Sequence, residues 1–178
     1  MNIPFHPWPK TPRLNREIII TEKLDGTNSL VYITEEGEIF AGSRSRWITP
    51  QDDNYGFAGW VERNKEKLIL LGPGKHFGEW WGNGLQRKYG KKEKTFSLFN
   101  AGRWTKETIP DCCDVVPILY QGPFSTEKIQ ETLENLKTNG SVAAPGFMRP
   151  EGIIVFHTAA QMTFKVTCEN DEKAKGLG

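Results

Sequence analysis

Cysteine is scarce in this sequence, and its arrangement is not that of a cross-linked or zinc-binding protein. The 178 residues include three cysteines: Cys112 and Cys113 are adjacent, Cys168 stands apart, and no C-x-x-C spacing occurs. An odd number of cysteines at these spacings argues against both a disulfide framework and a structural zinc site. We therefore expect a reducing, intracellular compartment and a cytoplasmic protein.

A charge excess and a long apolar run are also missing. The 23 basic and 22 acidic residues give a net charge of +1, whereas proteins that hold nucleic acid tightly usually carry a strong basic excess. Any contacts to phosphate must then come from local clusters. No stretch approaches the roughly 18 apolar residues of a membrane span, and the first residues lack the apolar core of a signal peptide. We expect neither membrane attachment nor a targeting signal.

What the sequence does contain is a series of β-rich segments interrupted by two helical ones. Helical spacing of apolar residues predicts helices over 58–71 and 125–137, the second with Ser125 as its cap and Gly140 at its close. Apolar, β-branched segments predict strands over residues 17–24, 27–34, 39–43, 75–81, 95–100, 152–157 and 161–167. The first three strands, joined by Asp-Gly and Glu-rich turns, are expected to form a β-meander.

Antiparallel strands with two inserted helices indicate an α+β fold. No repeat or linker divides the chain, so we expect residues 1–178 to form a single domain. Residues 1–16, rich in proline and aromatics, are expected to form an extended arm over the surface. Residues 168–178 are expected to be a loose polar tail.

The segment EKLDGTN, residues 22–28, carries the most chemical information. Lys23 lies at a strand end, two residues before an Asp-Gly turn, where its amine can face a cleft. A lysine becomes a nucleophile when desolvation or neighbouring cations depress its pKa. The tetrapeptide K-x-D-G by itself is equally typical of an exposed lysine before an ordinary hairpin, and the longer match favours a functional role.

Two further segments supply basic groups. GSRSRW, residues 42–47, places Arg44 and Arg46 on the same side of a strand, and a guanidinium suits phosphate because its donors bind two oxygens at once. FKVT, residues 164–167, contributes Lys165. Arginines in a polar segment are also commonly just solvated, so neither segment decides the function alone.

Two carboxylates and an aromatic residue complete the set. Glu79 in FGEWWG is an acid within an aromatic strand, which is odd for a core and suits a pocket wall. Phe99 in TFSLFN is an aromatic residue on a predicted strand, where a plain core position is an equal possibility. Glu151 opens the apolar strand EGIIVF, a position at which a glutamate is by itself commonplace.

Taken in order from Glu22 to Thr167, these six motifs resemble those of the covalent nucleotidyltransferases. That superfamily comprises ATP-dependent DNA and RNA ligases, NAD-dependent ligases and messenger-RNA capping enzymes. The resemblance is closest to the RNA ligases that repair nicked duplexes or act in RNA editing, where glutamate precedes the lysine and Thr-Asn follows the glycine. It implies an adenylation domain of antiparallel sheets with flanking helices, and an ATP-dependent ligase that seals 5′-phosphate to 3′-hydroxyl ends.

The resemblance also implies roles for the residues around the lysine. Lys23 would attack the α-phosphate of ATP to form a lysyl-AMP intermediate, and Glu22 would lie against the adenine edge. The turn residues Asp25, Gly26 and Asn28 would belong to the same nucleotide-binding site, with Asp25 shaping the turn.

The later motifs imply the walls of the site. Arg44 and Arg46 would face the ribose and phosphates, and Glu79 would bind the ribose or a metal-linked water. Phe99 would stack on adenine. From the C-terminal motifs, Ile154 or its neighbour Ile153 would cover the other adenine face. Glu151 would hold Mg²⁺ or Mn²⁺, which takes few protein carboxylates, and Lys165 would contact the α-phosphate. The family usually has K-x-K at this last motif, so a second cation is unaccounted for. The candidates are Lys173, Lys175 or an arginine.

The resemblance implies strand ends of RNA or DNA as partners. It does not choose between RNA and DNA, because these motifs bind the nucleotide and not the strand being sealed. Only eleven residues follow Thr167, so we expect no C-terminal oligonucleotide-binding barrel. We expect a monomer that binds its substrate weakly or with the help of a protein partner. The basic stretch 87–94 is either a phosphate contact or a solvated loop. The alternatives are a GTP-dependent capping-type guanylyltransferase and a non-catalytic nucleotide- or nucleic-acid-binding module.

Overall fold

The structure, a computed structural model, describes residues 3–172. In these residues the chain forms ten strands, two α-helices with a short third one, and one 3-10 turn. In chain order they are β1 (Glu17–Lys23), β2 (Thr27–Ile33), β3 (Ile39–Ser43), β4 (Trp47–Ile48), α1 (Phe57–Arg63), α2 (Lys65–Leu68), η1 (Ile69–Leu71), β5 (Gly74–Gly82), β6 (Lys94–Leu98), β7 (Asp114–Val115), β8 (Ile118–Pro123), α3 (Thr126–Asn139), β9 (Gly152–His157) and β10 (Met162–Thr167).

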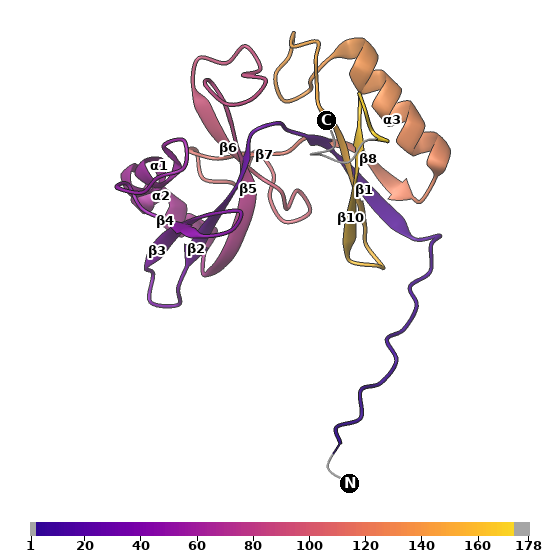
Figure 1. Cartoon of the computed structure of the whole chain (residues 1–178), viewed down its shortest axis with the longest axis horizontal. Coiled ribbons are helices and arrows are strands. Elements are labelled where there is room, and N and C mark those ends of the chain that lie inside the picture. Colours follow the sequence, from indigo (N-terminus) through magenta and orange to yellow (C-terminus); the bar gives the residue numbers. More distant parts are fainter. Residues whose placement is uncertain (1–2, 173–178) are drawn as a thin grey trace.

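The strands form two sheets (Figure 1). We call the four-stranded sheet, in the order β10-β9-β1-β8, sheet A, and the six-stranded sheet, in the order β4-β3-β2-β5-β6-β7, sheet B. Every neighbouring pair is antiparallel except β6 and β7. Antiparallel sheets with few helices agree with the α+β class expected from the sequence.

Each sheet is covered by helices on one face only. Apolar side chains of sheet B such as Val31 and Ile33 pack with Phe57 and Leu68 from α1 and α2. Leu133 and Leu136 of α3 pack against the apolar face of sheet A. Burial of these faces supplies the main stabilisation of both layers. The opposite faces of the two sheets are therefore free to form a cavity between them.

The helix α3 follows the sequence expectation closely. Ser125 accepts a hydrogen bond from the Lys128 amide at 3.2 Å and so caps the N-terminus. Gly140, with φ of 83°, ends the helix, and its amide donates to the Leu136 carbonyl.

The expected β-meander over the first three strands is wrong. β1 pairs with β8 and β9 in sheet A, whereas β2 pairs with β3 and β5 in sheet B. The Asp25-Gly26 turn thus carries the chain from one sheet to the other and does not close a hairpin. The physical reason is nonlocal: the Ile18 and Ile20 face of β1 is buried under α3, which is distant in the sequence.

The expected helix 58–71 is broken into three pieces, α1, α2 and η1. Asn64 has φ of −118° and stands between the first two, and its side chain donates to the Trp60 carbonyl at 2.8 Å. Asparagine competes for backbone hydrogen bonds in this way, which weakens a helix interior. The strands β4, β7 and β8 were not expected. β8 contains Gly122 and ends in Pro123, a composition that conceals a strand.

Residues 3–16 form the expected extended arm, and all of them are exposed. The arm leads away from the body and does not lie over its surface (Figure 1). It is tied at its base, where the Leu14 carbonyl lies 2.7 Å from the His157 Nε2. At the other end, residues 168–172 of the expected tail follow β10, and 173–178 lie outside the described residues. Within residues 3–172, no helix has the length and apolar character needed to span a bilayer.

Candidate active site between the two sheets

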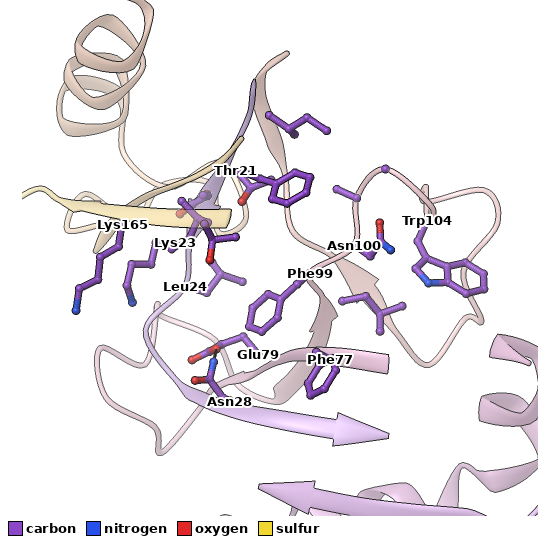
Figure 2. A pocket seen from close by; sticks show the side chains of 18 of the residues that line it. Thr21, Lys23, Leu24, Asn28, Phe77, Glu79, Phe99, Asn100, Trp104 and Lys165 are labelled. Atoms are coloured by element: carbon purple, nitrogen blue, oxygen red, sulfur yellow. Dashed lines mark hydrogen bonds between the residues drawn. The ribbon is translucent and has the colours of Figure 1, made fainter. Parts of the chain in front are cut away.

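A cavity of about 1120 Å³ lies between the uncovered faces of the two sheets. Its walls come from β1, β9 and β10 of sheet A, from β2, β5 and the end of β6 in sheet B, and from the segment 99–104 that follows β6. Figure 2 shows side chains from these elements directed toward one another. Most of the residues expected to form a site from the sequence meet here.

Lys23 reaches the cavity because of the alternation along β1. Ile18 and Ile20 point into the core under α3, so Ile19, Thr21 and Lys23 point the other way. The Lys23 Nζ lies 2.7 Å from the Glu151 Oε2, and the two side chains are 18% and 5% exposed. Lys23 is paired across the sheet with Gly152, and this register brings Glu151 beside the lysine.

Glu79 is held by the turn that follows Lys23. Its Oε1 accepts a hydrogen bond from the Gly26 amide at 3.0 Å, and its Oε2 accepts one from the Asn28 side-chain amide at 2.9 Å. A Cβ at Gly26 would stand 2.2 Å from the Trp80 carbonyl oxygen, so only glycine allows this close approach. The motifs around Lys23 and Glu79 are thus one hydrogen-bonded unit.

Burial gives Glu79 unusual proton affinity. Desolvation raises its pKa to about 7, against the lowering effects of the Gly26 hydrogen bond and of the nearby Lys23 charge. The Glu151 carboxylate adds to the rise, which places the two acids close enough to interact electrostatically. A carboxyl group that titrates near neutrality inside a cleft is typical of functional sites.

Two residues that the sequence interpretation left out of the site hold Asp25. Arg87 Nε lies 2.9 Å from the Asp25 Oδ2, and the Asp25 amide donates to the Tyr89 hydroxyl at 2.9 Å. Arg87 Nη1 also donates to the Arg149 carbonyl at 3.1 Å, two residues before Glu151. The sequence predicts the stretch 87–94 to be either a phosphate contact or a solvated loop. Arg87 instead contacts both segments that carry the Lys23–Glu151 pair.

The floor and walls of the cavity match several expectations. Phe99 lines the cavity and is partly exposed there, whereas Phe96 is fully buried in the core of sheet B. Ile154 and Lys165 also line the cavity, and they are paired across β9 and β10 in register with Thr21 of β1. In Figure 2 the Lys165 and Lys23 side chains extend in the same direction.

The two arginines that follow β3 lie in different surroundings. Arg44 lines the cavity. Arg46 is outside the set of lining residues and forms a two-pronged pair with Asp52, with Nη1–Oδ2 and Nη2–Oδ1 distances of 2.6 and 3.1 Å. The expectation that Arg46 faces the site is therefore wrong. The irregular turn at residues 44–46 breaks the strand alternation on which it depended.

Glu22 departs from its expected place as well. Its backbone borders the cavity, but its carboxylate lies on the opposite side of β1 from Lys23 and is 1% exposed. Oε1 accepts from the Ser141 hydroxyl at 2.6 Å, and Oε2 accepts from the amides of Val142 and Ala143. Burial raises the pKa of Glu22, partly offset by these hydrogen bonds. The carboxylate anchors the loop after α3 and does not face the cavity, where the resemblance implied a contact with adenine.

The oxygen donors present fit a divalent cation of the Mg²⁺ or Mn²⁺ type. Within residues 3–172 no group of three or more acids, histidines or cysteines is gathered in a metal-binding arrangement. Mg²⁺ does not need one, because it is bound by one or two carboxylates and keeps its remaining waters. Glu151 and Glu79 are hard oxygen donors close to Lys23, although the Glu151 Oε2 is engaged by the Lys23 ammonium.

Cations other than Lys165 border the cavity. Arg44, Lys75 and Arg103 are among its lining residues and are candidates for the second cation that the sequence resemblance implies beside Lys165. Lys173 and Lys175, which were considered for this role, lie outside the described residues.

Comparison with known proteins gives a family and a fold. Residues 16–168 match the RNA ligase family. Mutants of an RNA ligase from Naegleria gruberi share the fold: one with AMP and Mn has a TM-score of 0.65 at 20% identity, covering 86% of this chain and 50% of that one. Another with ATP and Mn has a TM-score of 0.62 at 20% identity, covering 88% and 51%.

A ligand-free mutant of the Naegleria ligase gives a similar result, with a TM-score of 0.63 at 20% identity and coverage of 86% and 50%. This chain spans about half the length of these structures. No curated protein matches it. The match begins just before β1, the strand that ends at Lys23, and runs to the end of β10, the strand that carries Lys165. This chain therefore belongs to the RNA ligase family.

Proposed function

We propose that this chain is the nucleotidyltransferase domain of an ATP-dependent RNA ligase, in which Lys23 is the nucleophile. The observation that carries the proposal is the position of the Lys23 amine. It stands at the wall of a cavity large enough for a nucleotide, 2.7 Å from a buried carboxylate. Membership of the RNA ligase family supports the same reaction class.

The proposed reaction has three transfers. The Lys23 ammonium first gives a proton to solvent. Its nitrogen then forms a bond to the α-phosphorus of ATP, and the bond from that phosphorus to pyrophosphate breaks. An oxygen of a 5′-phosphate end next attacks the same phosphorus, and the bond to Lys23 breaks. Finally a 3′-hydroxyl oxygen attacks the phosphorus of the 5′ end, its proton is lost, and AMP leaves.

The cavity walls suit the parts of the nucleotide. Phe99 and Ile154 offer an aromatic and an aliphatic surface for the two faces of adenine. Glu79, fixed by Gly26 and Asn28, can accept a hydrogen bond from a ribose hydroxyl. Lys165 and Arg44 can neutralise phosphoryl oxygens, and such charge stabilisation commonly accounts for much of catalysis.

Glu151 would serve two partners in turn. While Lys23 is an ammonium, the Glu151 carboxylate is paired with it. Loss of the proton and attachment of AMP remove that charge, so the carboxylate becomes able to hold Mg²⁺ or Mn²⁺. The cation, when bound, would polarise phosphoryl oxygens. Asp25 is a positioning residue, since Arg87 and Tyr89 engage it on the side of the turn.

The proposal also covers how the chain is divided into a domain and an arm. We take residues 17–167 as one catalytic domain, with 3–16 as an arm. The chain spans half of the Naegleria structures. For the residues described, the grip on RNA or DNA strand ends would come from local contacts or from a partner. We propose a monomer that acts on RNA ends, and matched RNA and DNA nicks would test the choice of strand.

The test is covalent labelling with α-labelled ATP and Mg²⁺ or Mn²⁺, followed by denaturing electrophoresis. Wild type is expected to retain the label, and Lys23→Ala to lose it entirely, because the substitution removes the amine that lies 2.7 Å from Glu151. The Lys165→Ala variant serves as a comparison, with label formed more slowly but on the same residue. Label retained by Lys23→Ala would overturn the assignment.

Labelling also separates the two alternatives. A capping-type guanylyltransferase would label with GTP and not with ATP. A non-catalytic module would bind nucleotide without gaining the mass of an adenylate. The presence of both Lys23 and Glu151 in contact favours the enzyme.

A further inference from the structure

Three aromatic side chains gather on an uncovered face of sheet B. Tyr32, Phe40 and Trp47 come from β2, β3 and β4, and their ring centroids lie 5.9 to 6.3 Å apart. Phe40 is 46% exposed and Trp47 55%. We call these three residues the aromatic patch. Rings that contact one another and still face solvent are a common feature of binding surfaces.

The strand register places the aromatic patch on the cavity side of the sheet. Tyr32 lies directly between Phe40 of β3 and Lys75 of β5, so all three share one face. Trp47 is paired with Gly42, which in turn is paired with Leu30 of the same face. Because Lys75 lines the cavity, the patch continues the cavity wall outward along the sheet.

The next row of residues leads inward to the reacting groups. Leu30 is paired with Phe77, which is 54% exposed and lines the cavity, and Asn28 is paired with Glu79. Gly42 leaves the face flat where the Trp47 ring lies, since a Cβ there would stand 3.5 Å from Trp47 Cε3. A nearly continuous apolar and aromatic surface therefore runs from the outer edge of sheet B to Glu79.

We propose that unpaired nucleotides next to the strand end being sealed bind this surface, with their bases on the aromatic patch. This inference rests on the proposed ligase function and adds a preference for single-stranded flanks. Aromatic side chains on an open sheet face accept bases by stacking, in a manner that tolerates any base sequence.

The charges beside the patch favour a polynucleotide over a protein segment. Arg44 and Lys75 stand on the cavity side, where the phosphates of a strand entering the site would pass. The acidic turn with Glu35, Glu36 and Glu38 lies beyond Ile33 and Ile39, at the far end of the β2–β3 hairpin. Repulsion from this turn would direct the strand across the sheet toward the cavity and not along the hairpin.

The experiment measures binding of a short fluorescent single-stranded RNA, and of the same sequence as a blunt duplex, by anisotropy. Trp47→Ala and Phe40→Ala are expected to weaken single-strand binding about tenfold each, and to leave duplex binding and adenylation by ATP at wild-type levels. Trp47→Phe, which keeps a ring, is expected to stay close to wild type. Leu70→Ala, an exposed apolar residue of η1, is the matched control and is expected to change nothing.

A direct mapping on the unaltered protein covers the case in which a variant fails to fold. Ultraviolet crosslinking of the single strand to wild type, followed by peptide analysis, is expected to mark the peptides of residues 27–48. Crosslinks confined to other segments would overturn the proposal, as would wild-type affinity in folded Trp47→Ala.

Other outcomes separate this inference from its foundation. If Trp47→Ala abolishes a self-association seen by sedimentation and leaves RNA binding intact, the patch is a protein interface and the proposal fails. If wild type never becomes adenylated yet binds single strands through Trp47, the ligase assignment fails while the patch stands. If adenylation is normal and the patch variants bind RNA with wild-type affinity, the proposal for the aromatic patch fails while the ligase assignment stands.

Discussion

At the scale of single residues, the pair formed by Lys23 and Glu151 sets the starting state of the site. The Lys23 Nζ lies 2.7 Å from the buried Glu151 carboxylate, so the amine is fixed in position at the cavity wall. In the proposed reaction, attachment of AMP to Lys23 removes this ion pair and leaves the Glu151 carboxylate able to take a second partner.

Glu79 makes a prediction about pH. Its pKa of about 7 in the folded protein lies above the ordinary value of 4.5, because burial disfavours the charged form. Between these values the folded protein binds more protons than the unfolded chain, so stability falls as pH rises from about 4.5 through 7. Glu79→Gln is expected to remove this fall, on the order of 2 kcal/mol in the free energy of unfolding.

Urea unfolding of wild type and Glu79→Gln at pH 5 and pH 8, without metal or nucleotide, measures the effect. The relevant quantity is the difference between the two proteins, since other groups such as Glu22 and His76 also titrate with shifted pKa values. An identical change with pH in both proteins would show that Glu79 ionises normally.

At the scale of elements, the loop between β5 and β6 joins the two halves of the site. Arg87 contacts Asp25, which follows β1, and Arg149, which precedes β9. Tyr89 is buried and packs between Trp81 and Phe147, with ring centroids at 4.9 and 4.7 Å. The loop is therefore anchored at two neighbouring positions, and its Arg87 fixes the spacing of Lys23 and Glu151.

Arg87→Ala is expected to slow adenylation roughly ten- to hundredfold, because a small misplacement of reacting groups is costly. Affinity for ATP should change little, since Arg87 does not line the cavity. Single-turnover labelling gives the rate, and nucleotide titration gives the affinity. Lys92→Ala, an exposed residue of the same loop, is the control. Arg87→Lys should recover part of the rate, whereas equal losses of rate and affinity would contradict a positioning role.

Much of the fold could be predicted at this scale, and the failures have a common cause. β3 and β9 match their expected bounds, since their patterns are local. The pairing of β1 with β8 and β9 could not be found from the Asp-Gly turn, because α3 decides which face of β1 is buried. β7 has two residues and pairs in parallel with β6, so no periodic pattern marks it.

The site shows the same division. Lys23, Glu79, Phe99 and Lys165 come from segments whose order along the chain is informative. Arg46 could not be placed, because its side chain is taken by Asp52, six residues on. Glu22 is different: neighbours on a strand point to opposite faces, so a cavity position for Lys23 already required Glu22 to point away.

At the scale of the whole molecule, the near balance of charge limits attraction to nucleic acid. The net charge is +1, so long-range steering contributes little. The cations along the proposed path of the strand are local ones at the cavity, such as Arg44, Lys75 and Lys165. A strand bound there would release few counterions, in contrast to a protein with a broad basic face.

The affinity for single-stranded RNA is accordingly expected to depend only mildly on salt. For about three phosphate contacts, the logarithm of the binding constant should fall with the logarithm of salt concentration with a slope of about 2. Lys75→Ala should lower that slope by about 0.7, because Lys75 lines the cavity beside the patch. Arg46→Ala should leave it unchanged, since Asp52 already neutralises that guanidinium. Anisotropy titrations across a salt series test both variants. Equal effects of the two substitutions would mean that the strand follows the outer turn and bypasses the cavity, whereas a much steeper slope in wild type would require a basic surface away from both sheets.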